Sequence, residues 1–212
     1  MADPAAQPAR GQYFEAEPAA ATSPRSITAD IGGMQLRFET DSGVFSPGRL
    51  DPGTRLLLAG APPLTAGELR VLDLGCGWGP IACFVALRSP AAEVLAVDVN
   101  GRALALTARN AEATGAGNVT VAHPDAVDPD RRFDRILCNP PIRIGKPALH
   151  ELLATWLDRL AAGGRAHLVV QRHLGSDSLA RWLTNRDHRV TRLASKRGYR
   201  LLEVQARTGS GP

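Results

Sequence analysis

From Arg70 onward, short apolar segments that suit strands alternate with longer segments that suit helices. The first apolar segment, RVLDL at 70–74, runs into a glycine-rich turn, and a helix is expected over 80–88. Strand-sized apolar runs separated by helices are typical of buried, mostly parallel strands with helices on both faces of the sheet. Ligands of such sheets bind beyond the carboxyl ends of the strands. Side chains that directly follow the strands are therefore the first candidates for a site.

The whole pattern predicts an α/β fold, a Rossmann-like, doubly wound sheet of seven mostly parallel strands with a short N-terminal extension. We expect the last two strands to form an antiparallel pair, and Gly163-Gly164 to end the helix at 147–162. Before the sheet, 31–40 suits a strand or hairpin and 54–59 a short helix. The expected strands are 70–74, 93–99, 118–123, 133–139, 165–171, 188–195 and 199–207, and the expected helices are 80–88, 102–114, 147–162 and 176–185.

We divide the 212 residues into a flexible arm at 1–25, an N-terminal extension at 26–66 and a main domain at 67–208. No apolar run approaches the ~18 residues of a membrane-spanning helix, and the first residues lack the apolar core of a secretion signal. The three cysteines form no CxxC pair and the five histidines no metal-binding spacing. These features predict a cytoplasmic protein with reduced thiols, without a metal and without a membrane partner, as a monomer or weak dimer.

Charge is divided unevenly along the chain. Residues 1–130 hold 9 Lys and Arg against 15 Asp and Glu, whereas residues 131–212 hold 16 against 6. Nearly all these cations are arginines, which form bidentate contacts with phosphates and stack on bases. The basic half suits either a polyanion or a solvated surface, and charge alone leaves both open.

The turn DLGCGWGP at 73–80 is the first candidate for a ligand site. Gly75, Gly77 and Gly79 permit a tight turn and a close approach of the backbone to a ligand. The spacing is GxGxG and not the GxGxxG of dinucleotide sites, and Asp73 would repel a diphosphate. These differences exclude an NAD oxidoreductase. Asp73 suits a cation such as an α-ammonium group, bound directly or through water, and Cys76 is a small spacer.

Further carboxylates follow the next two strands. Asp98 is placed to accept hydrogen bonds from ribose hydroxyls. Asp125, followed by Ala126, is placed to accept one from an adenine amine. A ligand with an ammonium group, a ribose and an adenine but no phosphate is S-adenosylmethionine (SAM).

The fourth strand ends in NPPIRIGK at 139–146. Two prolines remove backbone donors and stiffen the chain, which leaves the Asn139 side chain and the Pro140 carbonyl as fixed acceptors. Two acceptors on an exocyclic NH₂ would direct the nitrogen lone pair at a methyl group. The sulfonium of SAM is already an activated leaving group, so catalysis needs chiefly alignment and a favourable electrostatic setting. This pattern predicts N-methyl transfer.

These motifs, with FSPGRLDPGT at 45–54 and KRGYRLLEV at 196–204, resemble the class I SAM-dependent methyltransferases. Among them, the chain is similar to the small-domain RNA methyltransferases typified by 16S ribosomal RNA guanine-N2 methyltransferases. The resemblance implies that Phe45 and the stretch 51–54, with Thr54, close over the cofactor. It also implies that Gly75, Gly77, Asp98 and Asp125 hold SAM, that Val99 packs on its adenine, and that Asn139 lies between SAM and the target.

The resemblance further implies that residues 139–142 face the target base. Ile142 departs from the wider NPP pattern, in which an aromatic residue stacks on the planar acceptor, and this makes DNA adenine or protein glutamine a poorer substrate. Arg143 and Lys146 would hold phosphates beside the target nucleotide, and Arg197 would extend that track. The expected partner is ribosomal RNA or the small ribosomal subunit.

Two alternatives stay open on the sequence. The same NPP geometry would serve a small-molecule N-methyltransferase, although the chain has no large insertion to cap a small ligand. A SAM-binding or RNA-binding module without catalysis would fit the fold, but it would not need an intact Asn139-Pro140-Pro141.

Overall fold

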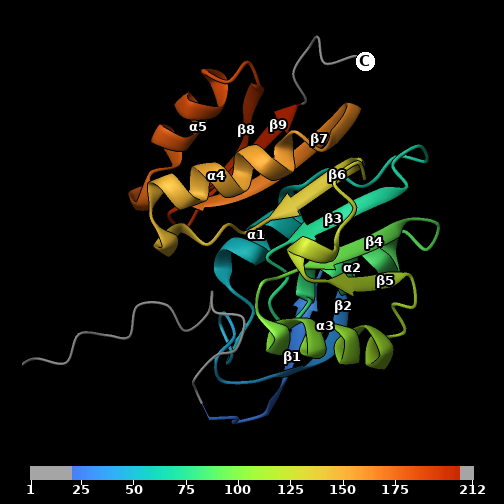
Figure 1. The fold of residues 1–212 in the computed structure, drawn as a ribbon. Coiled ribbons are helices and arrows are strands. Elements are labelled where there is room, and N and C mark those ends of the chain that lie inside the picture. The colour runs from blue at the N-terminus through green and yellow to red at the C-terminus, as the bar shows by residue number, and fades with distance from the viewer. Residues whose placement is uncertain (1–20, 206–212) are drawn as a thin grey trace, which may run out of the picture.

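The computed structural model describes residues 21–205, and most of the expected arm at 1–25 lies outside them. A sheet of seven strands dominates the fold, in the order β5-β4-β3-β6-β7-β9-β8 (Figure 1). Strands β5 to β7 are parallel, whereas β9 is antiparallel to both β7 and β8. The predicted α/β class and sheet are confirmed. The strands are β3 (Arg70–Leu74), β4 (Glu93–Val97), β5 (Val119–Ala122), β6 (Phe133–Cys138), β7 (Leu160–Gln171), β8 (Arg189–Lys196) and β9 (Tyr199–Gln205).

Helices cover both faces of the sheet because neighbouring side chains of a buried strand point to opposite faces. On β3, Val71 joins a core with α1, α2 and α3, while Leu72 joins a second core with α4 and α5 (Figure 1). The two cores explain why the central strands are apolar at nearly every position. The helices are α1 (Pro52–Gly60), α2 (Pro80–Arg88), α3 (Gly101–Thr114), α4 (Lys146–Leu157) and α5 (Ser176–Thr184).

A hairpin precedes the sheet, formed by β1 (Arg25–Ile31) and β2 (Met34–Thr40). Of the two forms expected at 31–40, the structure shows the hairpin, which begins six residues earlier than the predicted segment. The Phe38 ring packs edge-on against Trp78, with 5.0 Å between the ring centroids. The Asn110 side chain of α3 accepts from Glu39 N at 2.7 Å and donates to Glu39 O at 2.8 Å. The hairpin is thereby fixed beside α3.

The predicted helix at 147–162 is wrong at its carboxyl end. Helix α4 stops at Leu157, and β7 already begins at Leu160, which pairs with Phe133. Gly163-Gly164 lies inside β7 at a register shift, where a Cβ on Gly164 would come within 2.9 Å of Phe133 O. The two glycines therefore allow a bulge with close backbone contact, a role that glycine also serves in strands.

Within residues 21–205, no helix is long and apolar enough to cross a membrane. The same residues contain no cluster of three or more side chains suited to a metal ion. All three cysteines are buried and unpaired.

Candidate active site

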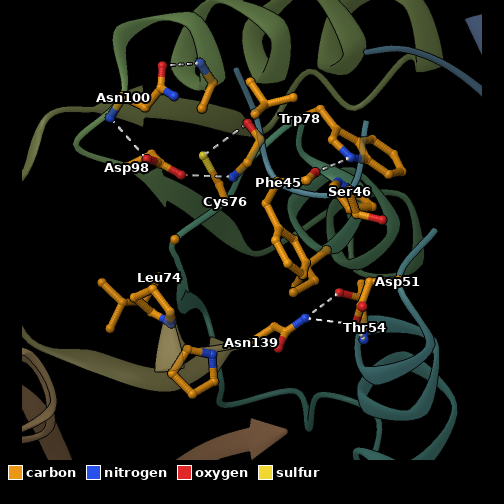
Figure 2. Close-up of a pocket in the computed structure, with 18 of the residues that line it drawn as sticks. Phe45, Ser46, Asp51, Thr54, Leu74, Cys76, Trp78, Asp98, Asn100 and Asn139 are labelled. Carbon is orange, nitrogen blue, oxygen red and sulfur yellow. Dashed lines mark hydrogen bonds between the residues drawn. The ribbon is translucent and has the colours of Figure 1, made fainter. Parts of the chain in front are cut away.

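A cavity of about 480 Å³ opens at the carboxyl ends of β3, β4 and β6 (Figure 2). Its walls come from the glycine turn, from the end of β4, from the NPP turn and from the loop before α1. Parallel strands end at one edge of the sheet, which is why segments so far apart in the sequence meet there. The predicted site residues that line it are Phe45, Thr54, Gly75, Cys76, Gly77, Asp98, Val99, Asn139, Pro140, Ile142 and Arg143.

The glycine turn presents bare backbone to this cavity. The amides of Gly75 and Cys76 both donate to Val97 O, at 2.8 and 3.1 Å, and this fixes the turn against β4. Gly75 and Gly77 have φ of 76° and 59°, which favour glycine, and a Cβ on either would meet no atom within 4 Å. A ligand can therefore approach the main chain closely. Burial raises the pKa of the Cys76 thiol, so this cysteine is not an activated nucleophile.

Asp98 is held rigidly by backbone amides. Its two carboxylate oxygens accept from Gly77 N and from Asn100 N, each at 3.0 Å. Burial raises the pKa of Asp98, while these amides act in the opposite direction. Each carboxylate oxygen can accept a second hydrogen bond, so the group remains available to two ligand hydroxyls.

Asp73 is fully buried behind the wall of the cavity and does not line it. One oxygen accepts from Ala82 N at 3.0 Å, and the other has no partner among the described residues. Burial raises the pKa of Asp73 to about 8, and the nearby Asp98 carboxylate raises it further. Gly79, which begins α2, also lies outside the lining. The contacts predicted for Asp73 and Gly79 stay predictions.

The turn after β5 is arranged differently from the prediction. Asp125 and Ala126 lie in a 3₁₀ turn (Pro124–Ala126), and only Pro124 of that turn lines the cavity. The Asp125 side chain is 92% exposed, and its carboxylate is 3.5 Å from His123 Nδ1. The structure thus does not bring this carboxylate to the cavity.

The orientation of the Asn139 amide is fixed by two acceptors. Its Nδ2 donates to Asp51 Oδ2 and to Thr54 Oγ1, each at 3.0 Å (Figure 2). A carboxylate can only accept, so Nδ2 must face Asp51 and Oδ1 must face the other way. Asn139 Oδ1 has no hydrogen-bond partner within residues 21–205. The site therefore holds an acceptor of defined direction.

The two prolines shape the rest of the turn. Pro141, with φ of −74° and ψ of 73°, is the centre of an inverse γ-turn in which Ile142 N donates to Pro140 O at 2.8 Å. One lone pair of the Pro140 carbonyl is therefore occupied, and the second is left for a ligand. Ile142 packs against the second core and lines the cavity.

Asp51 links three segments that close the cavity. Besides Asn139, it accepts from Gly53 N at 2.7 Å and caps α1. Tyr199 also bonds to it; burial raises the pKa of Tyr199, and the Asp51 carboxylate raises it further. Tyr199, at the start of β9, lines the cavity although the sequence gave no reason to place it there beyond its motif.

The loop before α1 is held over the cavity by an indole. Trp78 Nε1 donates to Phe45 O at 3.1 Å, and the Phe45 side chain is among those lining the cavity (Figure 2). With 47% of its surface exposed, Phe45 is one of the few large apolar residues on the surface of the described chain. An apolar ring at the mouth of a polar cavity suits contact with a planar ligand.

Cations surround the opening. Because Gln171 at the end of β7 pairs with Tyr199 at the start of β9, the β8–β9 turn lies at the same rim as the NPP turn. All of the rim cations are exposed and lack an ion-pair partner within the described chain, but only the first lines the cavity. They are Arg143, Lys146, Arg172, Lys196 and Arg197.

The family model "Methyltransferase small domain" matches residues 35–203. The uncharacterized protein YbxB of Bacillus subtilis is 32% identical over 91% of this chain and 97% of its own length. Ribosomal RNA small subunit methyltransferase C of Shewanella pealeana is 36% identical over 65% of this chain, but only 41% of its own length is matched.

Among solved structures, the 16S rRNA N2 guanosine methyltransferase RsmC of T. thermophilus, in complex with AdoMet and guanosine, superposes with a TM-score of 0.76. It is 27% identical, and the match covers 90% of this chain and 52% of that chain. This chain thus spans about half of the RsmC relatives that it matches. A family model that covers most of the chain, together with the glycine turn and the NPP turn on one cavity, shows that this chain belongs to the methyltransferase small domain family.

Proposed function

We propose that this SAM-dependent methyltransferase transfers a methyl group to the exocyclic N2 amine of a guanine in small-subunit ribosomal RNA. The observation that carries the proposal is the fixed Asn139 amide, whose Nδ2 is held at 3.0 Å by both Asp51 and Thr54. The acceptor Oδ1 then faces the side from which an amine donor would enter. The RsmC relatives, which are named for this substrate and position, support the same reaction.

In this proposal SAM supplies an activated methyl group, and the protein binds and aligns. The Asp98 carboxylate accepts from the ribose hydroxyls, and the bare backbone of Gly75 and Gly77 lies against the rest of the cofactor. Asn139 Oδ1 and the remaining lone pair of Pro140 O accept the two N2 hydrogens, so that the nitrogen lone pair points at the methyl group. Such alignment replaces a strong general base.

Residues 26–66 form the part that we place over the cofactor. Phe45 and Thr54 both line the cavity, and the Trp78–Phe45 contact joins this segment to the glycine turn. In the proposal, the Val99 side chain packs on the adenine and Ile142 packs on the guanine.

Recognition of RNA is assigned to the rim cations. This chain spans only about half of its RsmC relatives, so the contacts must come from the domain described here or from the assembled substrate. Arg143, Lys146 and Arg197 lie on the rim with no competing carboxylate partner within residues 21–205. The reaction would take place in the cytoplasm, where ribosomal subunits are assembled.

The test offers the purified protein and tritiated SAM to naked 16S RNA, 30S subunits, 50S subunits, tRNA and a DNA control. Labelled RNA is then digested to nucleosides for mass spectrometry. We expect N2-methylguanosine from 16S RNA or from 30S subunits. Label in another base would overturn the guanine assignment. No transfer to any nucleic acid, with SAM binding confirmed by calorimetry, would instead favour a small-molecule amine as acceptor.

A further inference from the structure

A second groove lies between α5 and the strands β8 and β9, at the edge of the sheet (Figure 1). Its volume is about 320 Å³, and it shares no lining residue with the SAM cavity. Most of its polar lining comes from arginines and from the first turn of α5: Ser176, Asp177, Arg181, Arg192 and Arg200.

The groove is positively charged. Arg181 and Arg192 are exposed, and neither has an ion-pair partner within residues 21–205. Arg200 is paired with Asp177, but its Nε is buried without a hydrogen-bond partner in the described chain. Three guanidinium groups therefore face a single carboxylate, which leaves an excess of two positive charges for a ligand.

A buried hydroxyl also points to a ligand. Ser176 has no exposed surface, and its Oγ finds no hydrogen-bond partner within residues 21–205. It begins α5, whose N-cap is Gly175, so no side chain caps the first amides of this helix. A hydroxyl donor and a helix N-terminus both favour an anionic oxygen. The groove thus combines donors of two kinds with an unbalanced positive charge.

The groove continues from the active site. Arg200 directly follows Tyr199, which lines the SAM cavity, and it pairs in the sheet with Ser195, next to the rim residue Lys196. A chain that leaves the target pocket across the β8–β9 turn would reach Arg200 first and then Arg192, which lies farther along β8. The order of these side chains suits a polymer with regularly spaced negative charges.

We propose that this groove binds a backbone phosphate of the substrate RNA, away from the nucleotide that is methylated; the inference rests on the proposed function. Arg181 and Arg192 form bidentate contacts with the phosphate oxygens, and the Ser176 hydroxyl donates to one of them. Asp177 competes with the phosphate for Arg200. Bases are not read here, so this contact sets affinity and register and not the identity of the target.

The experiment measures binding of naked 16S RNA by filter retention from 50 to 300 mM KCl, without SAM, apart from any measurement of methyl transfer. The groove variant is R181A/R192A. The matched control is R165A/R189A, which removes two exposed arginines that have no ion-pair partner in the described chain and line neither pocket. SAM affinity and melting temperature verify that each variant is folded.

We expect R181A/R192A to bind RNA about tenfold more weakly than the control, and its log–log salt slope to be smaller by about 0.7 to 0.9, the loss of one phosphate contact. S176A should weaken binding about threefold with an unchanged melting temperature, because the hydroxyl it removes has no partner in the fold. D177N should bind RNA more tightly, because it releases Arg200.

Groove and control variants with equal affinity and equal salt slope would overturn the proposal. So would a loss of binding to 30S subunits without a loss on naked RNA, since the groove would then contact a ribosomal protein. The two proposals fail separately. Groove-dependent RNA binding without methyl transfer would overturn only the function, and methyl transfer by a native protein whose groove variants bind normally would overturn only the groove.

Discussion

The two halves of the sheet bind by opposite means. On the β3–β5 side, the polar groups at the cavity are a carboxylate and backbone amides, and the Asp98 oxygens are held by Gly77 N and Asn100 N. On the β6–β9 side, the Asn139 amide lies beside a rim of cations without ion-pair partners in the described chain. The first half suits a small ligand with hydroxyls and an ammonium group, and the second suits a planar base on a polyanion.

Ion pairing follows the same division. Arginines of the β1–β5 half are neutralised on the surface, as in Arg70–Asp134 at 2.8 Å and Arg109–Glu39 at 3.3 Å. In residues 131–212, cations outnumber carboxylates by 16 to 6, so most have no partner to find. The comparison teaches that cofactor binding and RNA binding can be altered separately, and the variants below test that separation.

The largest effect is expected for N139A. Methyl transfer to RNA should fall about 10²- to 10³-fold, because the acceptor that aligns the amine is lost. SAM affinity, measured by calorimetry, should stay within about threefold, because Asp98 and the glycine turn are intact. An equal loss of SAM binding in a folded N139A protein would show that the two halves do not act separately.

D98A should produce the converse result. SAM affinity should fall about 10- to 100-fold with the loss of charged hydrogen bonds to the cofactor, while RNA affinity should be unchanged. D125A is the matched control, since the Asp125 carboxylate is 92% exposed and lies outside the cavity. A loss in D125A as large as in D98A would restore the adenine contact that the sequence predicts.

K146A/R197A should weaken RNA binding about tenfold at moderate salt and lower the log–log salt slope by one to two units of about 0.7 to 0.9. SAM affinity should not change, because neither residue lines the cavity. R165A/R189A again serves as the control. The same salt slope in both double variants would remove the rim from the RNA-binding surface.

The smallest effect is expected from D73N, and it depends on pH. Because burial raises the pKa of Asp73 from 3.8 to about 8, the folded protein keeps this proton while the unfolded chain loses it. The free energy of unfolding therefore decreases as pH rises between these two values, and D73N removes that decrease. The melting temperature of D73N relative to the native protein should be higher at pH 8 than at pH 5 by about 3 °C or more. A pH-independent difference would contradict the raised pKa.

Much of the fold could be predicted from the sequence because its local signals agree. The strand at 70–74 and the helix at 80–88 match to the residue, since apolar runs lie between glycines and Pro80. Gly163-Gly164 misled the prediction because two glycines suit a helix end and a strand bulge equally, and only the pairing with β6 decides. The antiparallel order of β7, β9 and β8 was predicted only for the last pair.

The site was predictable where a residue directly follows a strand, and less so elsewhere. Asp98 and Asn139 line the cavity as expected, because strand ends converge whatever the loops do. Asp125 does not, because its turn directs the side chain to solvent, where His123 lies beside it. Tyr199 reaches the cavity only through the antiparallel pairing of β9 with β7, a tertiary feature without a local signal.

The contact between Asp51 and Asn139 has a consequence for selectivity. With its amide nitrogen occupied by the carboxylate, Asn139 cannot flip, so an incoming base meets an oxygen and never an NH₂ group. An exocyclic carbonyl of any RNA base would be repelled at this position, whereas an exocyclic amine would be accepted. The protein thus discriminates amine from carbonyl before it reads any base, by means of a residue 88 positions away in the sequence.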